Sequence, residues 1–414
     1  MVVMKTQISA HTDSYFAVFC IMGAFAILSS TMSKNPVLNP FATSLGTPYD
    51  LLGFIASAST IPGILVSLPA ASLSDRIGRR KVLFFSAFVF ASAPFLYLFV
   101  AAWWQLALVR FYHGFATAIF VPVTEATVAE LFPTKRGERI SILSSTTGIG
   151  RTLAPILGGA ILTAGGTILL PVDYNYNGLF LAVAIAGITT FVLASLLLTE
   201  NKTRAPQTLN GSNSRTEIFR GWKQVSRNRS ALAVGFVQAS QYYVFGAIEF
   251  FIVGYMVDVA KLDALFAGIF LSVQVATVIV LRPFLGRLSD TRGRRTPIIL
   301  GSIIGSLSAL AIAFTTQFPI LLLISVGYGF GFAMVISSTS PLMSELAPQG
   351  LVGASMGFLS TLMDIGQTLG PFVSGAILAS FNKQYIALFA SLSLILVAST
   401  LVFTRSKTAK TKSM

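Results

Sequence analysis

The chain has 414 residues, of which 54% are hydrophobic and only 11% are charged, and its mean hydropathy is +0.76. Soluble domains carry about 25% charged residues, so this composition excludes a large soluble core. The net charge of +14 would suit a nucleic-acid-binding protein if the chain were soluble, but the charge is distributed along loops in a way that excludes that class.

Apolar runs of about 20 residues recur along the chain, and each is long enough to cross roughly 30 Å of hydrocarbon as a helix. The runs are continuous rather than alternating, which predicts helices and not barrel strands. The first run is long and lacks a small-residue cleavage site, so we expect it to stay as a span. The predicted spans, about twelve in number, are 14–42, 49–74, 81–101, 104–131, 138–168, 177–199, 230–257, 263–288, 296–316, 318–345, 351–380 and 384–404.

Basic residues are strongly biased to one side of these spans. About 24 Lys and Arg fall in loops and tails on one side, whereas only Lys261 and Lys383 fall on the other. The positive-inside rule then predicts a multi-pass protein of the cell (inner) membrane with both termini in the cytoplasm.

A polar stretch over residues 200–229 is the only long interruption of the apolar pattern. It predicts a cytoplasmic linker between an N-terminal bundle (1–199) and a C-terminal bundle with a basic tail (230–414). Its second half, residues 217–225, alternates apolar and basic residues, as expected of a short helix on the anionic membrane surface. Membrane lipids are therefore expected partners.

An internal repeat appears when the two halves are overlaid at a shift of about 215 residues. The segment from Asp75 to Arg80 falls on Asp290 to Arg295, and Glu130 falls on Glu345. At a shift larger by one residue, the segment 150–159 falls on 366–375. The repeat predicts an all-α polytopic membrane protein with twelve transmembrane helices in two pseudo-symmetric six-helix bundles and a substrate site near mid-membrane.

The segment 71–81, Ala-Ser-Leu-Ser-Asp-Arg-Ile-Gly-Arg-Arg-Lys, resembles the cytoplasmic loop signature of the major facilitator superfamily, with Ala71 where Gly is usual. The resemblance extends over the chain and is greatest to the twelve-helix drug/proton antiporter branch. An Asp at one helix end and an Arg four residues later can pair with an acid on a neighbouring helix. The simpler alternative is that these Arg residues only enforce topology. The candidate cytoplasmic gate comprises Asp75, Arg76, Gly78, Arg79, Arg80, Glu130, Asp290, Gly293, Arg294 and Glu345.

The fourth span contains Arg110, in a segment similar to the family motif whose membrane-embedded Arg is linked to proton coupling. His113 stands where the family usually has Gln, and a histidine titrates near neutral pH. An Arg inside a span costs about 2.5 to 3.5 kcal/mol on insertion scales, so we expect it to face a wet cavity or an acid. The alternative is a structural Arg bonded to helix carbonyls.

The fifth span contains a Gly- and Pro-rich segment similar to the family's antiporter motif, with Ala154 replacing its second Gly. This resemblance implies export, and plain helix packing by small residues is the alternative. The motif and its repeat supply the candidates Gly150, Pro155, Gly158, Gly159, Gly370 and Pro371.

At the repeat shift, Lys34 falls on Glu249, so opposite charges occupy equivalent positions of the two halves. We expect them to pair in one state of the transporter and to separate in another. The other charges expected to be buried give an electropositive first half and an acidic second half, which would suit an anionic or zwitterionic solute. The candidates for substrate or proton coupling are Lys34, Arg110, His113, Glu125, Arg151, Gln238, Gln241, Tyr242, Tyr243, Glu249 and Asp364.

No phosphate-binding Gly-Lys-Ser/Thr loop is present, which favours a proton or ion gradient over ATP as the energy source. The single cysteine, Cys20, excludes a disulfide framework and a thiolate metal cluster. We therefore expect a monomeric, proton-coupled exporter of a small amphipathic compound, with no cofactor, metal or enzymatic activity. Alternatives are import of an organic anion or sugar by symport, and a non-transporting membrane sensor or lipid-scrambling protein.

Overall fold

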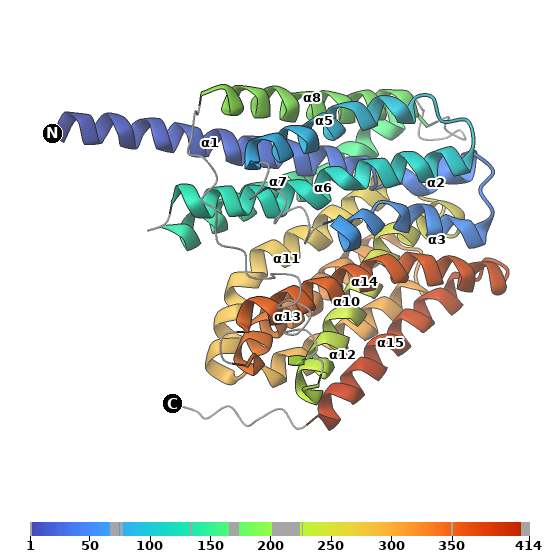
Figure 1. Ribbon diagram of the computed structural model, residues 1–414. Helices are drawn as coiled ribbons and strands as arrows, with labels where there is room; N and C mark the ends of the chain where they lie inside the picture. Colours follow the sequence, from blue (N-terminus) through green and yellow to red (C-terminus); the bar gives the residue numbers. More distant parts are fainter. Residues whose placement is uncertain are drawn as a thin grey trace. The chain divides into compact units, whose positions relative to one another are not determined.

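A computed structural model describes residues 2–66, 74, 78–132, 135–164, 174–200, 224–225, 227–348 and 351–406, with side chains described from 16 on and not for 197–200. All regular secondary structure among these residues is helical (Figure 1). The helices of the first half are α1 (Val2–Met32), α2 (Leu38–Ser44), α3 (Tyr49–Ala58), α5 (Arg79–Tyr97), α6 (Trp103–Leu131), α7 (Arg136–Thr163) and α8 (Tyr176–Glu200). Those of the second half are α10 (Arg229–Asp258), α11 (Ala264–Arg292), α12 (Arg295–Ile312), α13 (Phe318–Leu346), α14 (Val352–Ser380) and α15 (Tyr385–Arg405).

The helices form two compact units. Unit 1 comprises Met1–Gly46, Ala58–Gln207 and Ala267–Ser272, and unit 2 comprises Thr47–Ser57, Thr208–Phe266 and Val273–Met414. Each half of the chain thus contributes one short segment to the unit built mainly by the other half. The predicted linker helix lies almost entirely outside the described residues.

Ten of the described helical segments are long and apolar enough to cross a membrane. Two of the predicted spans are not among them. In the first, the apolar part with described side chains, Phe16–Met32, is short. In the fifth, α7 opens with Arg136, Glu138 and Arg139, and five hydroxyl residues follow between positions 141 and 147, so its mean hydropathy is low.

The first predicted span, 14–42, is not one continuous helix. Helix α1 ends at Met32, and α2 begins at Leu38 after a turn over residues 33–37. Pro36 lacks a backbone N–H and disfavours helical geometry at the residue before it, which accounts for the break. The sequence had predicted Lys34 inside a continuous helix, but it lies in this turn.

In unit 1, α1 packs on α7 and α8, and α5 packs on α6 and α8 (Figure 1). Its core contains large buried rings, among them Phe19, Phe90 and Phe120. The approach of α7 to α1 depends on Gly150, because a Cβ there would lie 2.3 Å from the Ala24 carbonyl oxygen.

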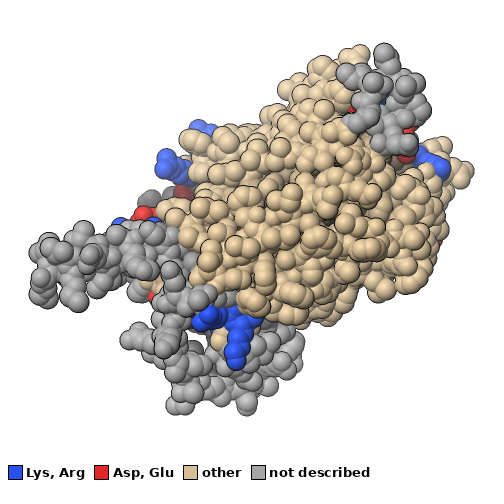
Figure 2. Space-filling view, turned by 90° about the horizontal axis from the view of Figure 1, so that it is seen from above, with Lys and Arg blue, Asp and Glu red and all other residues tan. Residues whose placement is uncertain are grey.

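In unit 2, α10 packs on α14, and α12 packs on α13 and α15. Many large apolar side chains of both units remain exposed, as on spans that face lipid; examples are Ile185, Leu323 and Leu394. The face shown in Figure 2 is almost entirely uncharged, with Lys and Arg confined to its margins.

Candidate functional site

The loop motif of unit 1 joins α5 to α6 through an ion pair. Gly78 has φ 96° and ψ 130°, a conformation open only to Gly without strain, and it turns the chain into α5. Arg79, the first residue of α5, donates from Nη2 to Glu130 Oε1 near the end of α6 at 2.6 Å. Asp75 and Arg76 lie outside the described residues, and Arg80 is exposed.

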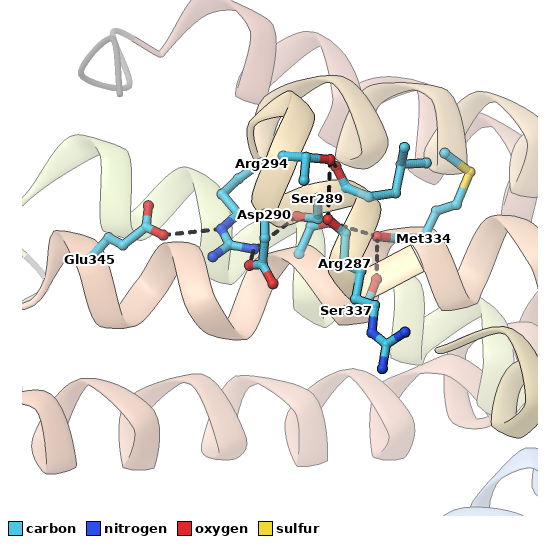
Figure 3. A network of polar contacts seen from close by, with 10 residues as sticks. Arg287, Ser289, Asp290, Arg294, Met334, Ser337 and Glu345 are labelled. Carbon is cyan, nitrogen blue, oxygen red and sulfur yellow. Dashed lines mark hydrogen bonds and ion pairs between the residues drawn. The ribbon is translucent and has the colours of Figure 1, made fainter. Parts of the chain in front are cut away.

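The second copy of the motif has the same construction in unit 2. Gly293 has φ 83° between α11 and α12, and the next residue, Arg294, donates from Nε to Glu345 Oε1 on α13 at 3.0 Å. Arg294 also pairs with Asp290 and donates from Nη1 to Ser289 Oγ at 3.2 Å (Figure 3). The repeat in sequence is therefore a repeat in geometry.

Arg294 is held as a cation by its two carboxylate neighbours. Partial burial by itself would lower the pKa of Arg294, but hydrogen bonds and charge from Glu345 and Asp290 outweigh it and raise that pKa above its ordinary value. The side chain is 14% exposed, whereas those of Asp290 and Glu345 are 60% and 39% exposed. The arrangement can hold the ends of α11, α12 and α13 together at any physiological pH.

Arg110 lies inside unit 1, where its guanidinium contacts hydroxyl groups. It is 2% exposed, donates from Nη2 to Ser59 Oγ at 2.5 Å and from Nη1 to Tyr97 Oη at 3.5 Å. His113, also 2% exposed, has Nδ1 at 3.3 Å from Tyr97 Oη and 3.4 Å from Ser33 Oγ. The sequence led us to expect a wet cavity or an acid around Arg110, and the structure places Ser and Tyr hydroxyls there.

The remaining candidate charges have different surroundings. Arg151 is exposed on α7, so the prediction that it is buried is wrong. Glu125 on α6 and Asp364 on α14 are partly buried, and Glu249 on α10 is 6% exposed. Lys34 belongs to unit 1 and Glu249 to unit 2, and their pairing stays a prediction.

The polar residues of α10 do not share one face. Gln238 accepts from Thr339 of α13 at 2.6 Å, and Tyr242 packs edge-to-face on Phe332 of the same helix. Gln241 instead donates to Ser302 of α12 at 3.2 Å. The backbone at Tyr243 faces α14, where a Cβ at Gly370 would lie 2.0 Å from the Tyr243 carbonyl oxygen. Of the four, only Gln238 and Tyr242 therefore face α13.

The Gly- and Pro-rich motifs make two equivalent helix contacts. In unit 2, a Cβ at Gly53 of α3 would lie 2.1 Å from the Pro371 carbonyl oxygen, and Ser57 donates to the Thr368 carbonyl at 2.6 Å. In unit 1, a Cβ at Gly268 of α11 would lie 2.2 Å from the Pro155 carbonyl oxygen. Gly158 and Gly159 are buried on α7, and Gly158 faces the Asn35 carbonyl. Both motifs therefore serve close packing within a unit.

Sequence reasoning missed several residues of the site. Ser33, Ser59 and Tyr97 surround Arg110 and His113, yet hydroxyl residues in apolar spans are commonplace and nothing singled them out. In unit 2, Gln274 and Tyr328 are fully buried with side-chain atoms that have no hydrogen-bond partner among the described residues. The repeat could have found them, because Gln274 and Tyr328 occupy the positions of Ser59 and His113. Among the described side chains, no group of three or more His, Cys, Asp and Glu is placed to hold a metal ion.

Comparison with known proteins identifies the family. The model of the Major Facilitator Superfamily matches residues 14–371 and again 234–413. Multidrug resistance protein 2 of Bacillus subtilis is 25% identical over 87% of this chain and 88% of its own length, and the probable galactarate/D-glucarate transporter GarP of Escherichia coli is 24% identical over 81% and 82%. A bacterial homolog of the human lysosomal transporter Spinster has the same fold, with a TM-score of 0.76 at 15% identity over 95% of both chains. This chain is a multi-pass membrane transporter, not an enzyme, and it belongs to the Major Facilitator Superfamily.

Proposed function

We propose that the protein exports a small amphipathic compound in exchange for protons, by alternating access across the cell membrane, with both termini in the cytoplasm. The observation that carries the proposal is that ionisable side chains are enclosed within the spans: Arg110 and His113 in unit 1, and Glu249 in unit 2. Such side chains are costly in a membrane and mark substrate or proton pathways.

The direction of transport rests on a resemblance. The Gly150–Gly159 segment is similar to the antiporter motif, and a multidrug resistance protein is among the relatives. The ion pairs Arg79–Glu130 and Arg294–Glu345 would serve as paired cytoplasmic gate elements, one in each unit.

A second candidate is import of an organic anion by symport. It is favoured by Arg110, a buried cation whose side-chain hydrogen bonds among the described residues go only to hydroxyl groups, and by the relative GarP, a probable galactarate/D-glucarate transporter. Both candidates use the same charged residues and differ in the direction of net flux.

Vesicle transport separates the two candidates. A panel of radiolabelled amphipathic compounds and organic anions is offered to inverted and right-side-out vesicles that carry a proton gradient. Export predicts uncoupler-sensitive accumulation of a panel compound in inverted vesicles, and loss of that accumulation in Glu249→Gln and Asp364→Asn. Accumulation only in right-side-out vesicles would establish import, and gradient-independent behaviour of the whole panel would refute the transport proposal.

A further inference from the structure

The cluster around Arg110 in unit 1 contains hydrogen-bond donors that the protein does not satisfy. Arg110 carries five N–H groups, and its Nε has no partner among the described residues. The same holds for Nε2 of His113. Both side chains are 2% exposed, so bulk water does not satisfy them either.

The hydrogen bonds around Tyr97 indicate that Nε2 of His113 is a donor. The Tyr97 oxygen accepts from Arg110, which leaves the Tyr97 hydroxyl hydrogen for His113 Nδ1 at 3.3 Å. Ser33 donates its own hydrogen to the Ser30 carbonyl at 2.8 Å. A neutral His113 that accepts at Nδ1 carries its hydrogen on Nε2. Arg110 and His113 therefore each present one N–H without an acceptor.

Charge in this cluster is unbalanced as well. Among the acids whose side chains are described in unit 1, Glu130 pairs with Arg79, Glu138 is exposed on α7, and Glu125 is on α6, about 22 Å along the helix from Arg110. Among the described residues Arg110 takes part in no ion pair, and its side-chain hydrogen bonds go to hydroxyl groups. A buried guanidinium without a counter-charge is strongly unfavourable, because the Born cost is offset only by a close anion and by filled hydrogen bonds.

The equivalent positions of unit 2 show the same local geometry. A Cβ at Gly114 of α6 would lie 2.3 Å from the Ser59 carbonyl oxygen, and a Cβ at Gly329 of α13 would lie 2.7 Å from that of Gln274. In both units the helices meet at this point. Gln274 and Tyr328 also have polar side-chain atoms without partners in the part of the chain that the structure describes.

The cluster around Arg110 in unit 1 and its equivalent in unit 2 differ in charge. Ser325 takes the position of Arg110 in unit 2, so the cationic group belongs to unit 1 alone. An unmet hydrogen bond recurs at one equivalent position, His113 in unit 1 and Tyr328 in unit 2, although the residues differ. This recurrence argues that the position meets a ligand and is not an isolated packing defect.

We propose that Arg110 and His113 form a carboxylate-binding site within unit 1, with Arg110 Nε–H and His113 Nε2–H as the donors to the two oxygens of one carboxylate. This inference rests on the proposed transport function and names the chemistry of the transported compound: an amphipathic carboxylate. Ser59 and Tyr97 hold the guanidinium in orientation. A site this enclosed takes its ligand in another conformation of the transport cycle, by a shift of populations.

The test is ligand-dependent thermal unfolding of the purified full chain in detergent. Sodium benzoate is compared with benzamide, its neutral isostere, and with sodium chloride at equal ionic strength. A ligand that binds the folded state raises the unfolding temperature in a saturable way. We expect benzoate alone to do so. Arg110→Gln should weaken benzoate binding by about tenfold or more, because it removes the charged partner of a buried pair.

Three further variants complete the design. Arg110→Lys keeps the charge, loses the planar fork and should bind benzoate more weakly than the natural chain but better than Arg110→Gln. His113→Phe removes one donor and should also weaken binding. Arg282→Gln, which removes an exposed Arg of α11, should leave benzoate binding unchanged.

The outcomes are separable. Equal stabilisation by benzoate and benzamide, or by benzoate and chloride, would overturn the carboxylate assignment without reference to any variant, as would the absence of saturable stabilisation by benzoate. If Arg110→Gln fails to fold, Arg110→Lys and His113→Phe take its place. Both should bind benzoate more weakly than the natural chain, and unchanged binding in both would overturn the site. Because binding is measured without a gradient, failure of proton-coupled export in vesicles with benzoate binding intact would overturn the proposed function and leave the site in place.

Discussion

Glu249 places a carboxylate on α10 where the side chain is only 6% exposed. If this group carries the coupled proton, Glu249→Gln should largely abolish gradient-driven transport and flatten its pH dependence, because an amide does not take up a proton at physiological pH. Glu138→Gln, which removes an exposed carboxylate from α7, is the matched control and should transport normally. Flux against pH in vesicles measures both, and an unchanged pH profile in Glu249→Gln would exclude it as the carrier.

Gly293 adopts φ 83° and ψ 155°, which an L side chain reaches only with strain. Gly293→Ala should therefore destabilise the folded protein by about 1 to 3 kcal/mol and lower its unfolding temperature in detergent. Gly286→Ala, seven residues earlier on α11, is the control: a Cβ there meets nothing within 4 Å, and Ala is the better helix former. Equal unfolding temperatures for the two variants would contradict the strained turn.

At the residue scale, the sequence identified the charged residues but not the side chains that surround them. Arg110, Glu249 and the gate pairs stand out because an ionisable residue in or beside an apolar run is rare. Tyr97 and Ser59, which hold Arg110, do not stand out, because a hydroxyl in a span usually bonds to its own helix. Arg151 was expected to be buried since it lies in an apolar segment, but hydropathy does not tell which face of a helix a side chain occupies.

Helix α14 approaches α10 at Gly366, where a Cβ would lie 2.1 Å from the Ala239 carbonyl oxygen. Gly366→Ala should force the two helices apart and cost about 1 to 3 kcal/mol of stability, as overpacking does. Gly353→Ala on the same helix meets nothing within 4 Å and should be neutral or slightly stabilising. Denaturation of both variants in detergent measures the difference, and a stable Gly366→Ala would show that the helices can separate freely.

At the element scale, apolar run length predicted most of the spans and missed two details. The turn before α2 arises from Pro36, a single residue whose effect is lost in a hydropathy average over some 20 positions. Helix α7 is long enough to cross a membrane, but its first half is polar, so its mean hydropathy is low for a span.

The whole molecule should have both ends in the cytoplasm. A green fluorescent protein fused after Arg405 should fluoresce, and alkaline phosphatase fused there should be inactive. The same phosphatase inserted at Lys383, between α14 and α15, should be active, since this loop carries one of only two basic residues assigned to the outer side. Active phosphatase at the C-terminus would reverse the topology.

At the scale of the molecule, the internal repeat was the most informative signal. The shift that aligned Arg79 with Arg294 also aligned their partners, because duplicated halves keep equivalent ion pairs. The exchange of short segments between the halves was not predictable in this way. A pairwise overlay aligns each residue with its own counterpart and carries no information about which half a segment packs against.

That exchange has a consequence for split versions of the protein. Thr47–Ser57 clusters with unit 2, and Ala267–Ser272 clusters with unit 1. If the gene is cut within the region coding for residues 200–229, neither polypeptide contains all the pieces of either unit. We expect each fragment to be degraded when made alone and both to accumulate when co-expressed, as judged by immunoblotting of membranes. Fragments that persist independently would mean that the exchanged helical segments are dispensable.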